Sequence, residues 1–425
     1  MTETVFTYAA PGLKFGRGAS REVGWDVAQL VATAGGEARR VLLVTDPGVA
    51  ATGHPARVAG AMRERGLEVV LFDGARVEPT DASMEEAVAF ARDAGPFDAV
   101  VAVGGGSSID TAKAVDLMLT NDGTLMDYVN APVGGGRAPE RALLPLVAVP
   151  TTTGTGAEST TICVLDVLAL KVKTGISHQR LRPTLAVVDP DLTTSQPPLV
   201  TASCGMDILC HALESWTARW YADLEAKRPE QRVPYCGANP IADMWSEKAL
   251  TLLAASFRTA VRDGSDGHAR EQMALAATFA GLGFGNAGVH VPHACAYPIA
   301  GRVRDYRPAG YPDDEPIVPH GMAVVMTAPA AFALTFDASP QRHLRAAELL
   351  GATAPAGPGA LPEVLRGLMR DVGLPSGLAE LGYGEADVDD LVGGALQQQR
   401  LLATAPVDVT AEHLAGVFRD SLEHW

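Results

Sequence analysis

Five short runs of branched apolar residues recur through the first half of the chain and limit what it can fold into. They read "RRVLLVTD", "LEVVLFD", "FDAVVAVGGG", "LLPLVAVP" and "TLAVVDP", and they lie between residues 39 and 190. Each run is continuous rather than alternating, as in parallel strands buried on both faces, and each ends in turn-forming or polar residues. Stretches with helical spacing, such as residues 54–66 and 83–95, separate them. This order predicts a doubly wound α/β domain.

The pattern changes at about residue 195. From there the segments lengthen and take the helical period, as in residues 242–264 and 361–373, so the second half is predicted to be all α. A polar insert at 217–240 separates two of these helices. Because 425 residues exceed one ordinary core, we expect two domains, an α/β domain over residues 1–195 and an all-α domain over residues 196–425.

The composition is that of a soluble globular protein, with 47% hydrophobic and 20% charged residues. The net charge of -16 includes no basic tract that would neutralise phosphates, so we expect no nucleic-acid partner. Five scattered cysteines without a CxxC pair favour a reducing compartment. The first residues, "MTETVFTYAAPG", lack the features of a targeting segment, and the apolar runs are short. We therefore expect a cytoplasmic protein without a membrane partner, unless a targeting segment was removed.

A glycine triplet follows one predicted strand in "VAVGGGSSIDTAKA", residues 101–114. Gly104, Gly105 and Gly106 allow the backbone to approach a ligand closely, and the following helix offers free N–H groups at its start. This is a phosphate site in physical terms, although the spacing matches neither GxGxxG nor the P-loop. A tight strand-to-helix turn is the alternative interpretation.

A second polar loop, "VPTTTGTGAEST" at 149–160, also follows a buried strand. Its hydroxyls, on Thr151, Thr152, Thr153 and Thr155, suit a phosphate or a ribose. Two such loops at strand ends are predicted to meet where open α/β sheets bind ligands. Asp46, at the end of another strand, either accepts hydrogen bonds from a ribose or caps a helix.

The segment "GMDILCHALES", residues 205–215, places Asp207 and His211 one helical turn apart in an otherwise apolar run. Downstream lie His290 and His293 in "GNAGVHVPHACAYP" and His320 in "IVPHGMAVV". A divalent cation would offset the cost of burying Asp207, and one carboxylate with imidazoles suits Fe²⁺ or Zn²⁺ rather than Ca²⁺ or Mg²⁺. A hydrogen-bonded Asp–His pair without metal is the alternative, and the sequence alone does not show that these segments converge.

Four of these stretches together resemble the iron-containing (group III) alcohol dehydrogenases. They are "VAVGGGSSIDTAKA", "PTTTGTGAEST", "DxxxHALES" and "PHGMAVV", in the family's usual order. Within the family the hydroxyacid–oxoacid transhydrogenase subgroup is most similar, through "ARVEPTD", "LKVKTGIS", "GANPIADMW" and "FAGLGFGNAGVH". The likeness extends from about residue 5 to the C-terminus.

The resemblance implies an N-terminal dinucleotide-binding α/β domain and a C-terminal helical metal-binding domain, with the active site between them. By motif, the implied metal ligands are Asp207, His211, His293 and His320. The implied dinucleotide-binding residues are Asp46, Gly105, Gly106, Ser107, Asp110, Thr151, Thr152, Thr155 and Lys173. A carboxylate at Asp46 disfavours a 2′-phosphate, so NAD is expected, with NADP as the alternative. Fe²⁺ is the expected metal and Zn²⁺ the alternative.

The chain departs from the family pattern around its third implied ligand. Where the family commonly has HGMAHP, this sequence has "HACAYP", so Tyr297 replaces a histidine near the substrate. Tyr297 and His290 are therefore the candidates for proton transfer, and the transhydrogenase subgroup shares the tyrosine. The replacement of HGM by HAC has no evident consequence.

The implied activity is metal-dependent hydride transfer between a hydroxyacid or alcohol and an oxoacid or aldehyde, of the 4-hydroxybutyrate and 2-oxoglutarate type, with the nicotinamide retained. An alcohol dehydrogenase with freely exchanging NAD(P) is the first alternative, and a cyclase-type lyase on the same fold is the second. Candidate cations for a substrate carboxylate are Lys171, Arg180, Arg302 and Arg304, for which an ordinary surface role is the alternative. We expect small-molecule substrates and a homo-oligomer.

Overall fold

The computed structural model describes residues 2–170, 172–311 and 315–425, and the chain divides into two compact units. The first unit comprises Ala10–Ser195, and the second joins Met1–Ala9 to Gln196–Trp425. From the sequence, residues 1–9 are expected to belong to the first domain. They belong instead to the second unit, because the Glu3 N–H donates to the Leu224 carbonyl at 2.8 Å. These residues carry no apolar pattern that would have assigned them. The functional labels of the two predicted domains stay a prediction.

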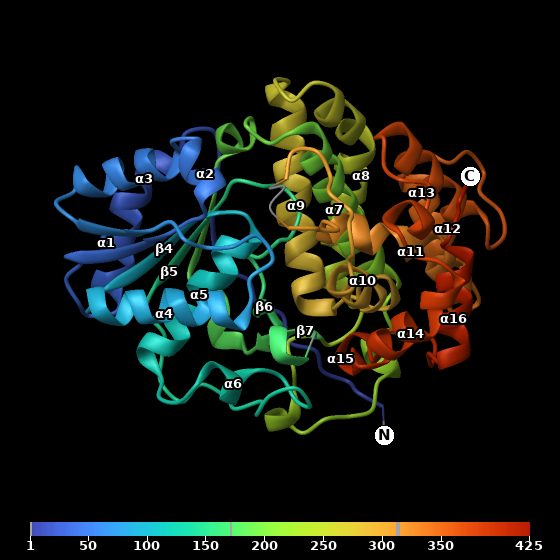
Figure 1. Ribbon diagram of the computed structural model, residues 1–425, viewed down its shortest axis with the longest axis horizontal. Coiled ribbons are helices and arrows are strands. Elements are labelled where there is room, and N and C mark those ends of the chain that lie inside the picture. Colours follow the sequence, from blue (N-terminus) through green and yellow to red (C-terminus); the bar gives the residue numbers. More distant parts are fainter. Residues whose placement is uncertain (1, 171, 312–314) are drawn as a thin grey trace. The chain divides into compact units, whose positions relative to one another are not determined.

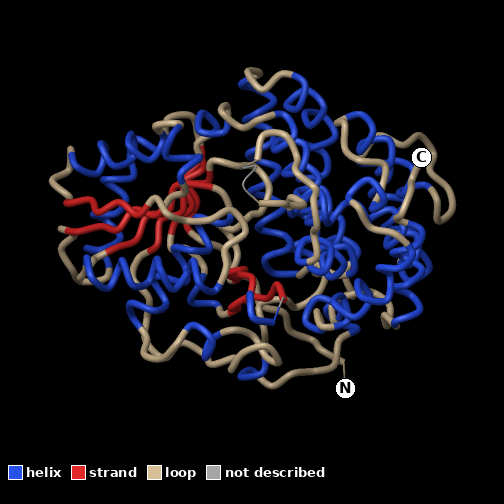
Figure 2. The backbone as a smooth tube through the Cα atoms, viewed as in Figure 1, coloured by secondary structure: helices blue, strands red, loops and turns tan. Residues whose placement is uncertain are grey.

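A parallel sheet forms the centre of the first unit (Figures 1 and 2). Its strand order is β1-β8-β5-β4-β2-β3, and every pairing is parallel. The strands are β1 (Gly12–Phe15), β2 (Arg40–Val44), β3 (Glu68–Phe72), β4 (Ala99–Gly104), β5 (Leu146–Pro150) and β8 (Leu185–Val188). The five apolar runs correspond to five of these strands. The sixth, β1, is a short edge strand with an exposed start, so its sequence lacks the continuous apolar signal.

Helices cover both faces of this sheet, which confirms the doubly wound α/β fold. They are α1 (Val23–Thr33), α2 (Pro47–Ala51), α3 (His54–Arg63), α4 (Asp81–Ala94), α5 (Gly106–Thr120) and α6 (Leu125–Tyr128). Figure 1 shows α1 and α3 on one face and α4 and α5 on the other. Leu43 and Val101 pack in the apolar cluster of the first pair, whereas Leu42 and Val100 pack in that of the second. Successive side chains are thus buried on opposite faces, and this explains why the runs are continuously apolar.

A two-stranded antiparallel hairpin, β6 (Ile162–Val167) and β7 (Val172–Ser177), lies in the first unit beside the sheet and was not predicted. Lys113 of α5 fastens it to the core. The Lys113 ammonium is fully buried and donates to the Ile162 carbonyl at 2.7 Å and to Thr160 Oγ1 at 3.1 Å. The hairpin mixes Thr, Lys, Gly and Asp with apolar residues, and this long-range anchor has no local sequence signal.

The second unit is helical, as predicted. Its helices are α7 (Pro198–Thr217), α8 (Pro240–Arg262), α9 (Gly267–Ala287), α10 (Val291–Gly301), α11 (His320–Thr335), α12 (Pro340–Leu349), α13 (Ala360–Asp371), α14 (Val388–Leu396), α15 (Gln399–Leu402) and α16 (Ala411–Asp420). Helix α7 packs against α8, α9 and α11, so its polar residues lie in the core. The approach of α8 requires Gly205, because a Cβ there would lie 2.0 Å from the Phe257 ring.

One helix is more apolar than the sequence analysis recognised. Residues 320–338 are long and apolar enough to cross a membrane by length and composition, with a mean hydropathy of 1.4, although the runs had been described as short. Two-thirds of this segment (67%) is buried inside the protein, where α11 packs against α7 and α10. Its apolar character therefore matches a core helix that has protein on nearly all sides.

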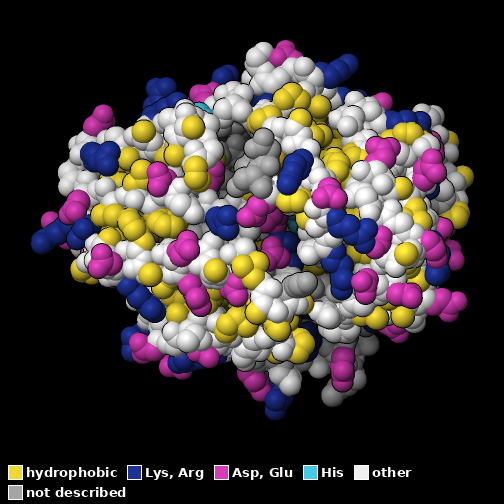
Figure 3. Space-filling view, in the orientation of Figure 1, with side chains coloured by type: hydrophobic (Ala, Val, Ile, Leu, Met, Phe, Trp, Pro, Cys, Tyr) yellow, Lys and Arg dark blue, Asp and Glu magenta, His cyan; other side chains and the backbone are white. Residues whose placement is uncertain are grey.

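Charged side chains of both signs are interspersed on the face that Figure 3 presents. Acidic residues exceed basic ones by 50 to 34 over the chain. On this face the excess is spread among Lys and Arg side chains rather than gathered in one patch, so like charges are kept apart.

We predict that Asp116 makes folding stability depend on pH. It is buried in α5, where Oδ1 accepts the Leu144 N–H at 2.9 Å and Oδ2 has no hydrogen-bond partner among the described residues. Burial raises the pKa of Asp116 from 3.8 to about 8. Because the folded pKa lies above the unfolded one, the protonated form is favoured by folding, and stability falls as pH rises from about 4 to 8. The slope is at most about 1.4 kcal/mol per pH unit.

Asp116→Asn removes this loss, so the variant should gain stability relative to the parent between pH 5 and pH 8. Chemical denaturation at the two pH values measures the difference. Asp93→Asn, an exposed position on α4, is the control and should show no such trend. An Asp116→Asn difference that is equal at both pH values contradicts the prediction.

Candidate functional site

Helix α7 presents Asp207 and His211 on one face in the core of the second unit. Asp207 Oδ1 lies 3.6 Å from His211 Nε2, as expected for residues four apart on a helix. Both side chains are nearly fully buried. This distance is too long for a good hydrogen bond between the carboxylate and the imidazole. It leaves room for a third group, such as a cation, that binds both atoms.

Two further helices bring imidazoles to the same oxygen. His293, the third residue of α10, places Nε2 3.5 Å from Asp207 Oδ1, and His320, the first residue of α11, places Nε2 3.8 Å from it. The ligand atoms of Asp207, His293 and His320 all lie within 4.8 Å of one another. The convergence that the sequence alone did not reveal is therefore present in the fold.

The donor set fits a divalent transition metal. Bonds of about 2.1 Å in a tetrahedral site separate neighbouring ligand atoms by roughly 3.4 Å, close to the three distances here. Asp207 Oδ1 and His293 Nε2 are buried without a hydrogen-bond partner among the described residues, as metal ligands would be before binding. Three of the four side chains are buried, whereas that of His320 is 28% exposed. The site is thus open on the His320 side, as a catalytic metal site must be.

Glu214 supports the ligands from behind. Its Oε1 accepts a hydrogen bond from His293 Nδ1 at 2.5 Å, and its Oε2 accepts the His290 N–H at 2.5 Å. A carboxylate in this position fixes the imidazole with Nε2 directed at the metal. Glu214 therefore holds both the ring of His293 and the start of the helix that carries it.

The two carboxylates control the protonation of the imidazoles. Although burial alone would lower it, Glu214 and Asp207 raise the pKa of His293 to about 9. Burial lowers the pKa of His211 to about 3, and the pKa of Asp207 lies well below its usual value because three imidazoles outweigh the effect of burial. Without metal, a proton at His293 balances the buried negative charge, and metal binding would displace it.

Two supporting residues were missed by the sequence analysis. Gly321 follows the candidate ligand His320, and a Cβ there would lie 2.1 Å from the Ser203 carbonyl oxygen, so only glycine lets α11 approach α7. The Phe284 ring stacks on His211 with centroids 3.8 Å apart. The motif "PHGM", in which a glycine follows a candidate ligand histidine, could have pointed to Gly321. Nothing in the sequence points to Phe284.

The two candidates for proton transfer lie in different surroundings. Tyr297 is one turn after His293 on α10, and its ring meets that of His320 edge to face at 6.5 Å. His290 is fully buried, and its Nε2 contacts Thr217 Oγ1 at 3.0 Å. Burial lowers the pKa of His290 to about 4. This environment argues against direct proton exchange between His290 and a substrate and suits a structural role.

The glycine and threonine loops adjoin in the first unit. Gly104 and Pro150 are paired at the carboxyl ends of the neighbouring strands β4 and β5. A Cβ at Gly105 would lie 3.2 Å from Thr152 Oγ1, and one at Gly106 would lie 2.8 Å from Thr155 Oγ1. The small residues thus admit the threonine loop against the first turn of α5. Ser107 lies in that turn, and Thr151 bonds to the Gly104 carbonyl at 3.0 Å.

Of the two roles that the sequence left open for Asp46, a helix cap and a ribose contact, the structure shows the cap. Asp46 caps α2, because its Oδ1 accepts the Val49 N–H at 2.9 Å. Its Oδ2 accepts the Ser108 hydroxyl at 2.9 Å, which joins the ends of β2 and β4. The strand order reverses between β2 and β4, the point at which open α/β sheets bind ligands. The helix-cap interpretation is confirmed, and contact with a ribose stays a prediction.

The remaining implied dinucleotide residues are engaged with the hairpin. Asp110 Oδ2 accepts the Val164 N–H at 2.9 Å. The buried Lys173 ammonium pairs with Glu78 and with Asp166, the latter at 3.0 Å. Carboxylates on both sides raise the pKa of Lys173, although burial opposes them. Their part in nucleotide binding stays a prediction.

The candidate cations for a substrate carboxylate have other partners. Arg302 pairs with Asp390 at 3.2 Å, and Arg304 pairs with Asp387. Arg180 donates to the carbonyls of Pro139 and Arg141. Lys171 lies outside the described residues. The surface alternative is therefore supported for the three arginines.

Comparison with known proteins decides the family. The model "Iron-containing alcohol dehydrogenase" matches residues 11–190, and "Fe-containing alcohol dehydrogenase family, C-terminal" matches residues 230–422. The chain belongs to the iron-containing alcohol dehydrogenase family. The protein named "Hydroxyacid-oxoacid transhydrogenase, mitochondrial" of Bos taurus is 42% identical over 431 residues, which cover 99% of this chain and 91% of that protein. The predicted resemblance is confirmed, and the chain is an oxidoreductase.

Solved structures agree in fold over almost the whole chain. A 1,3-propanediol oxidoreductase has a TM-score of 0.84 at 30% identity and covers 98% of this chain and 100% of its own. A sulfoacetaldehyde reductase from Bifidobacterium kashiwanohense, solved in complex with NAD⁺, has a TM-score of 0.79 at 28% identity, with 98% of each chain covered. Together with the clustered ligand atoms of Asp207, His293 and His320, these findings indicate an enzyme that uses a metal and NAD.

The expectation of a cytoplasmic location was wrong. The Bos taurus relative, like the others of its name, is described as mitochondrial. The expectation rested on the first twelve residues and on composition. The composition of a folded enzyme does not determine its compartment, because a targeting segment is read by the import machinery and contributes nothing to the core.

We predict that Glu214→Gln weakens metal binding about 10- to 100-fold, the usual effect of losing an outer hydrogen-bond partner of a ligand. The neutral amide keeps the size of the side chain but no longer supplies the negative charge that holds His293. Competition with a chelator, followed by elemental analysis, measures the change. Glu247→Gln, on the surface of α8, is the matched control and should retain the parental affinity. Parental affinity in Glu214→Gln contradicts this role.

Proposed function

We propose that this protein transfers a hydride reversibly between a hydroxyacid and an oxoacid through a nicotinamide that it retains. The convergence of Asp207, His211, His293 and His320 on one point carries the proposal, because it provides a metal centre within a family of oxidoreductases. The relatives that share 42% of their residues with the chain over nearly its full length support the acid substrates.

These four residues are the proposed ligands, with Fe²⁺ as the metal and Zn²⁺ as the alternative. One carboxylate and three imidazoles suit either ion. When bound, the metal would act as a Lewis acid toward the substrate oxygen, and the nicotinamide would carry the hydride. The chain itself contributes a fixed ligand geometry, because Glu214 orients His293 and Gly321 admits α11.

Tyr297 is the proposed proton donor and acceptor. It is mostly buried on the same helix as His293, and it contacts the ring of His320, the ligand that is partly exposed. A phenol beside the open edge of the ligand set is in position to exchange a proton at the substrate oxygen. His290, by contrast, is sealed against Thr217.

The proposed dinucleotide site is formed by the carboxyl ends of β2, β4 and β5. The free N–H groups at the start of α5 bind phosphate, with Gly105, Gly106 and Ser107 at that helix start. The hydroxyls of the threonine loop lie beside them. Asp46 would accept a ribose hydroxyl, which favours NAD over NADP.

A deuterium-transfer experiment tests the activity. The purified protein, without added nicotinamide, is given 4-hydroxybutyrate deuterated at C4 together with 2-oxoglutarate. We expect 2-hydroxyglutarate with deuterium at C2 and the aldehyde of the first substrate in equal amounts. This transfer should be faster than reduction of added NAD⁺ by 4-hydroxybutyrate alone.

The Asp207→Asn variant is the control and should lose the transfer, since it removes the charged ligand. A freely exchanging dehydrogenase would give the opposite result. It would reduce added NAD⁺ faster than it transfers deuterium, and it would make no labelled product until nicotinamide is supplied. That outcome would reject the retained cofactor while leaving the metal site intact.

We further predict that Asp46→Asn relaxes the preference for NAD. The amide keeps an oxygen for the cap of α2 and removes the charge that would repel a 2′-phosphate. The ratio of the Kd values for NADP⁺ and NAD⁺ should fall on the order of tenfold, the size of one partly screened charge interaction. Nucleotide titration of both proteins measures this ratio. An unchanged ratio would show that Asp46 acts only as a cap and a partner of Ser108.

A further inference from the structure

The connection between α9 and α10 determines where His293 lies. The two helices are bent by 103° at a break of a few residues, and His293 is the third residue after it. A small rotation of this connection would therefore move the imidazole relative to Asp207. Metal ligands tolerate displacements of only about 0.2 Å, so the connection must be held firmly.

The last two residues of α9 and one residue of the connection are tied through their carbonyls to two other segments of the second unit. The carbonyl of Asn286 accepts the Cys236 N–H at 2.9 Å, and that of Ala287 accepts the Gly237 N–H at 3.0 Å. The Val289 carbonyl accepts the Thr404 hydroxyl at 2.6 Å. The polar insert at 217–240 and the residues around 404 thus hold the connection through its backbone.

The side chain of Asn286 adds a contact with the first residues of the chain, which we term the N-terminal arm (residues 2–9). Asn286 Oδ1 accepts the Ala9 N–H at 2.9 Å, and Nδ2 donates to the Ala9 carbonyl at 3.1 Å. Nδ2 also donates to the Leu282 carbonyl of its own helix at 3.0 Å. The side chain is almost fully buried, so each of these partners replaces water that is not available there.

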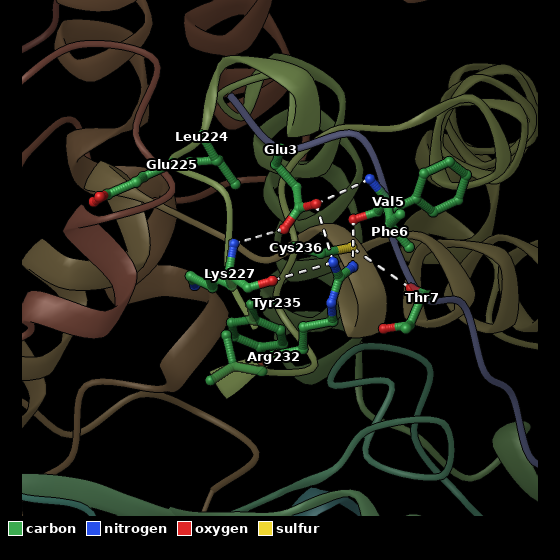
Figure 4. Close-up of a pocket in the computed structure, with 11 residues that line it drawn as sticks. Glu3, Val5, Phe6, Thr7, Leu224, Glu225, Lys227, Arg232, Tyr235 and Cys236 are labelled. Carbon is green, nitrogen blue, oxygen red and sulfur yellow. Dashed lines mark hydrogen bonds and ion pairs between the residues drawn. The ribbon is translucent and has the colours of Figure 1, made fainter. Parts of the chain in front are cut away.

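The other end of the N-terminal arm is fastened to the insert, as Figure 4 shows. Glu3 Oε2 accepts the Lys227 N–H at 3.1 Å, and Glu3 Oε1 pairs with Arg232 at the same distance. Arg232 also donates to the Val5 carbonyl at 2.8 Å. Cys236 Sγ lies between the arm and the end of α9, 3.6 Å from the Thr7 carbonyl and 3.2 Å from the Asn286 carbonyl. The arm therefore spans from the insert to Asn286.

We propose that Asn286 is a positioning residue that, with the N-terminal arm, holds His293 in the geometry for metal binding. The inference rests on the ligand set given under Proposed function. The insert and the arm together fasten one side of the α9–α10 connection, while Glu214 fastens the other through the His290 N–H. Loss of the Asn286–Ala9 pair frees the connection on the arm side, and His293 then departs from Asp207 more readily.

Two variants break this pair from opposite sides. Asn286→Ala removes both side-chain bonds to Ala9 and the bond to the Leu282 carbonyl, whereas Ala9→Pro removes only the N–H that Asn286 accepts. The control is Asp266→Ala, which removes the cap at the opposite end of α9, where Asp266 Oδ1 accepts the Ala269 N–H at 2.9 Å. It destabilises the same helix without touching the connection.

The measurements are made on the full chain loaded with Co²⁺ or Zn²⁺. The rate at which a chelator removes the metal reports how firmly His293 is held, and the visible spectrum of bound Co²⁺ reports the ligand geometry. Thermal unfolding of each protein gives its general stability. None of these readouts depends on the substrates.

We expect about tenfold faster metal loss and an altered Co²⁺ spectrum in Asn286→Ala, with a smaller change of the same kind in Ala9→Pro. The double variant should match Asn286→Ala alone, since Asn286→Ala already removes the bond that Ala9→Pro removes. Asp266→Ala should lower Tm and leave the rate within twofold of the parent. If Asn286→Ala does not fold, the rate of metal loss and the Co²⁺ spectrum of Ala9→Pro decide the question.

Parental rates and spectra in both arm variants would overturn the inference, as would equal acceleration in Asp266→Ala. A parent protein that binds no metal would instead refute the ligand set. A parent that binds metal normally but fails to transfer deuterium would refute only the proposed activity. The three failures are therefore distinguishable.

Discussion

A single carboxylate oxygen, Asp207 Oδ1, is the point on which the second unit is organised. It lies in the apolar interior of a helical unit, without a hydrogen-bond partner among the described residues and with three imidazole nitrogens 3.5–3.8 Å away. An isolated charge in such a place costs several kcal/mol. The fold tolerates this cost because positive charge nearby, from a protonated imidazole or from a metal ion, offsets the negative charge of the carboxylate. Helices α7, α10 and α11 must therefore meet there.

The same requirement explains the packing around the site. Helix α11 can bring His320 close only because Gly321 has no side chain, and α10 begins where Glu214 accepts the N–H of His290. Glu214 also holds the ring of His293, so one buried carboxylate sets both the start of a helix and the orientation of a ligand on it. Ligand geometry and helix packing are thus one network, and a change to either affects both.

The sequence predicted those features that have a local signal. Continuous apolar runs identified five of the six strands of the sheet, and the i, i+4 spacing of Asp207 and His211 placed two candidate ligands on one helix face. The convergence of His293 and His320 follows from how α7, α10 and α11 pack, so only the family resemblance could anticipate it. The edge strand β1 and the hairpin β6–β7 were missed because one is short and the other depends on the buried Lys113.

Two other differences between the sequence-based expectations and the structure also depend on long-range contacts. Residues 1–9 were assigned by their position in the chain, whereas their backbone bonds to Leu224 and Asn286 place them in the second unit. Asp46 was read as either a cap or a ribose contact, and its cap is formed while its second oxygen binds Ser108. A local pattern shows that a polar side chain needs a partner, but the partner itself is chosen by long-range packing.

The metal site by itself does not distinguish a transhydrogenase from an exchanging dehydrogenase. Both activities need the same polarisation of an alcohol or carbonyl oxygen, and both would use the same four side chains. What differs is the rate at which the nicotinamide leaves, and contacts with the nucleotide determine that rate. In the proposed dinucleotide site those contacts belong to the first unit, where the threonine loop lies against the glycine-rich start of α5 and Asp46 binds Ser108. Substitutions that convert one activity into the other are therefore expected among these loop residues, whereas changes to the four ligands should abolish both activities together.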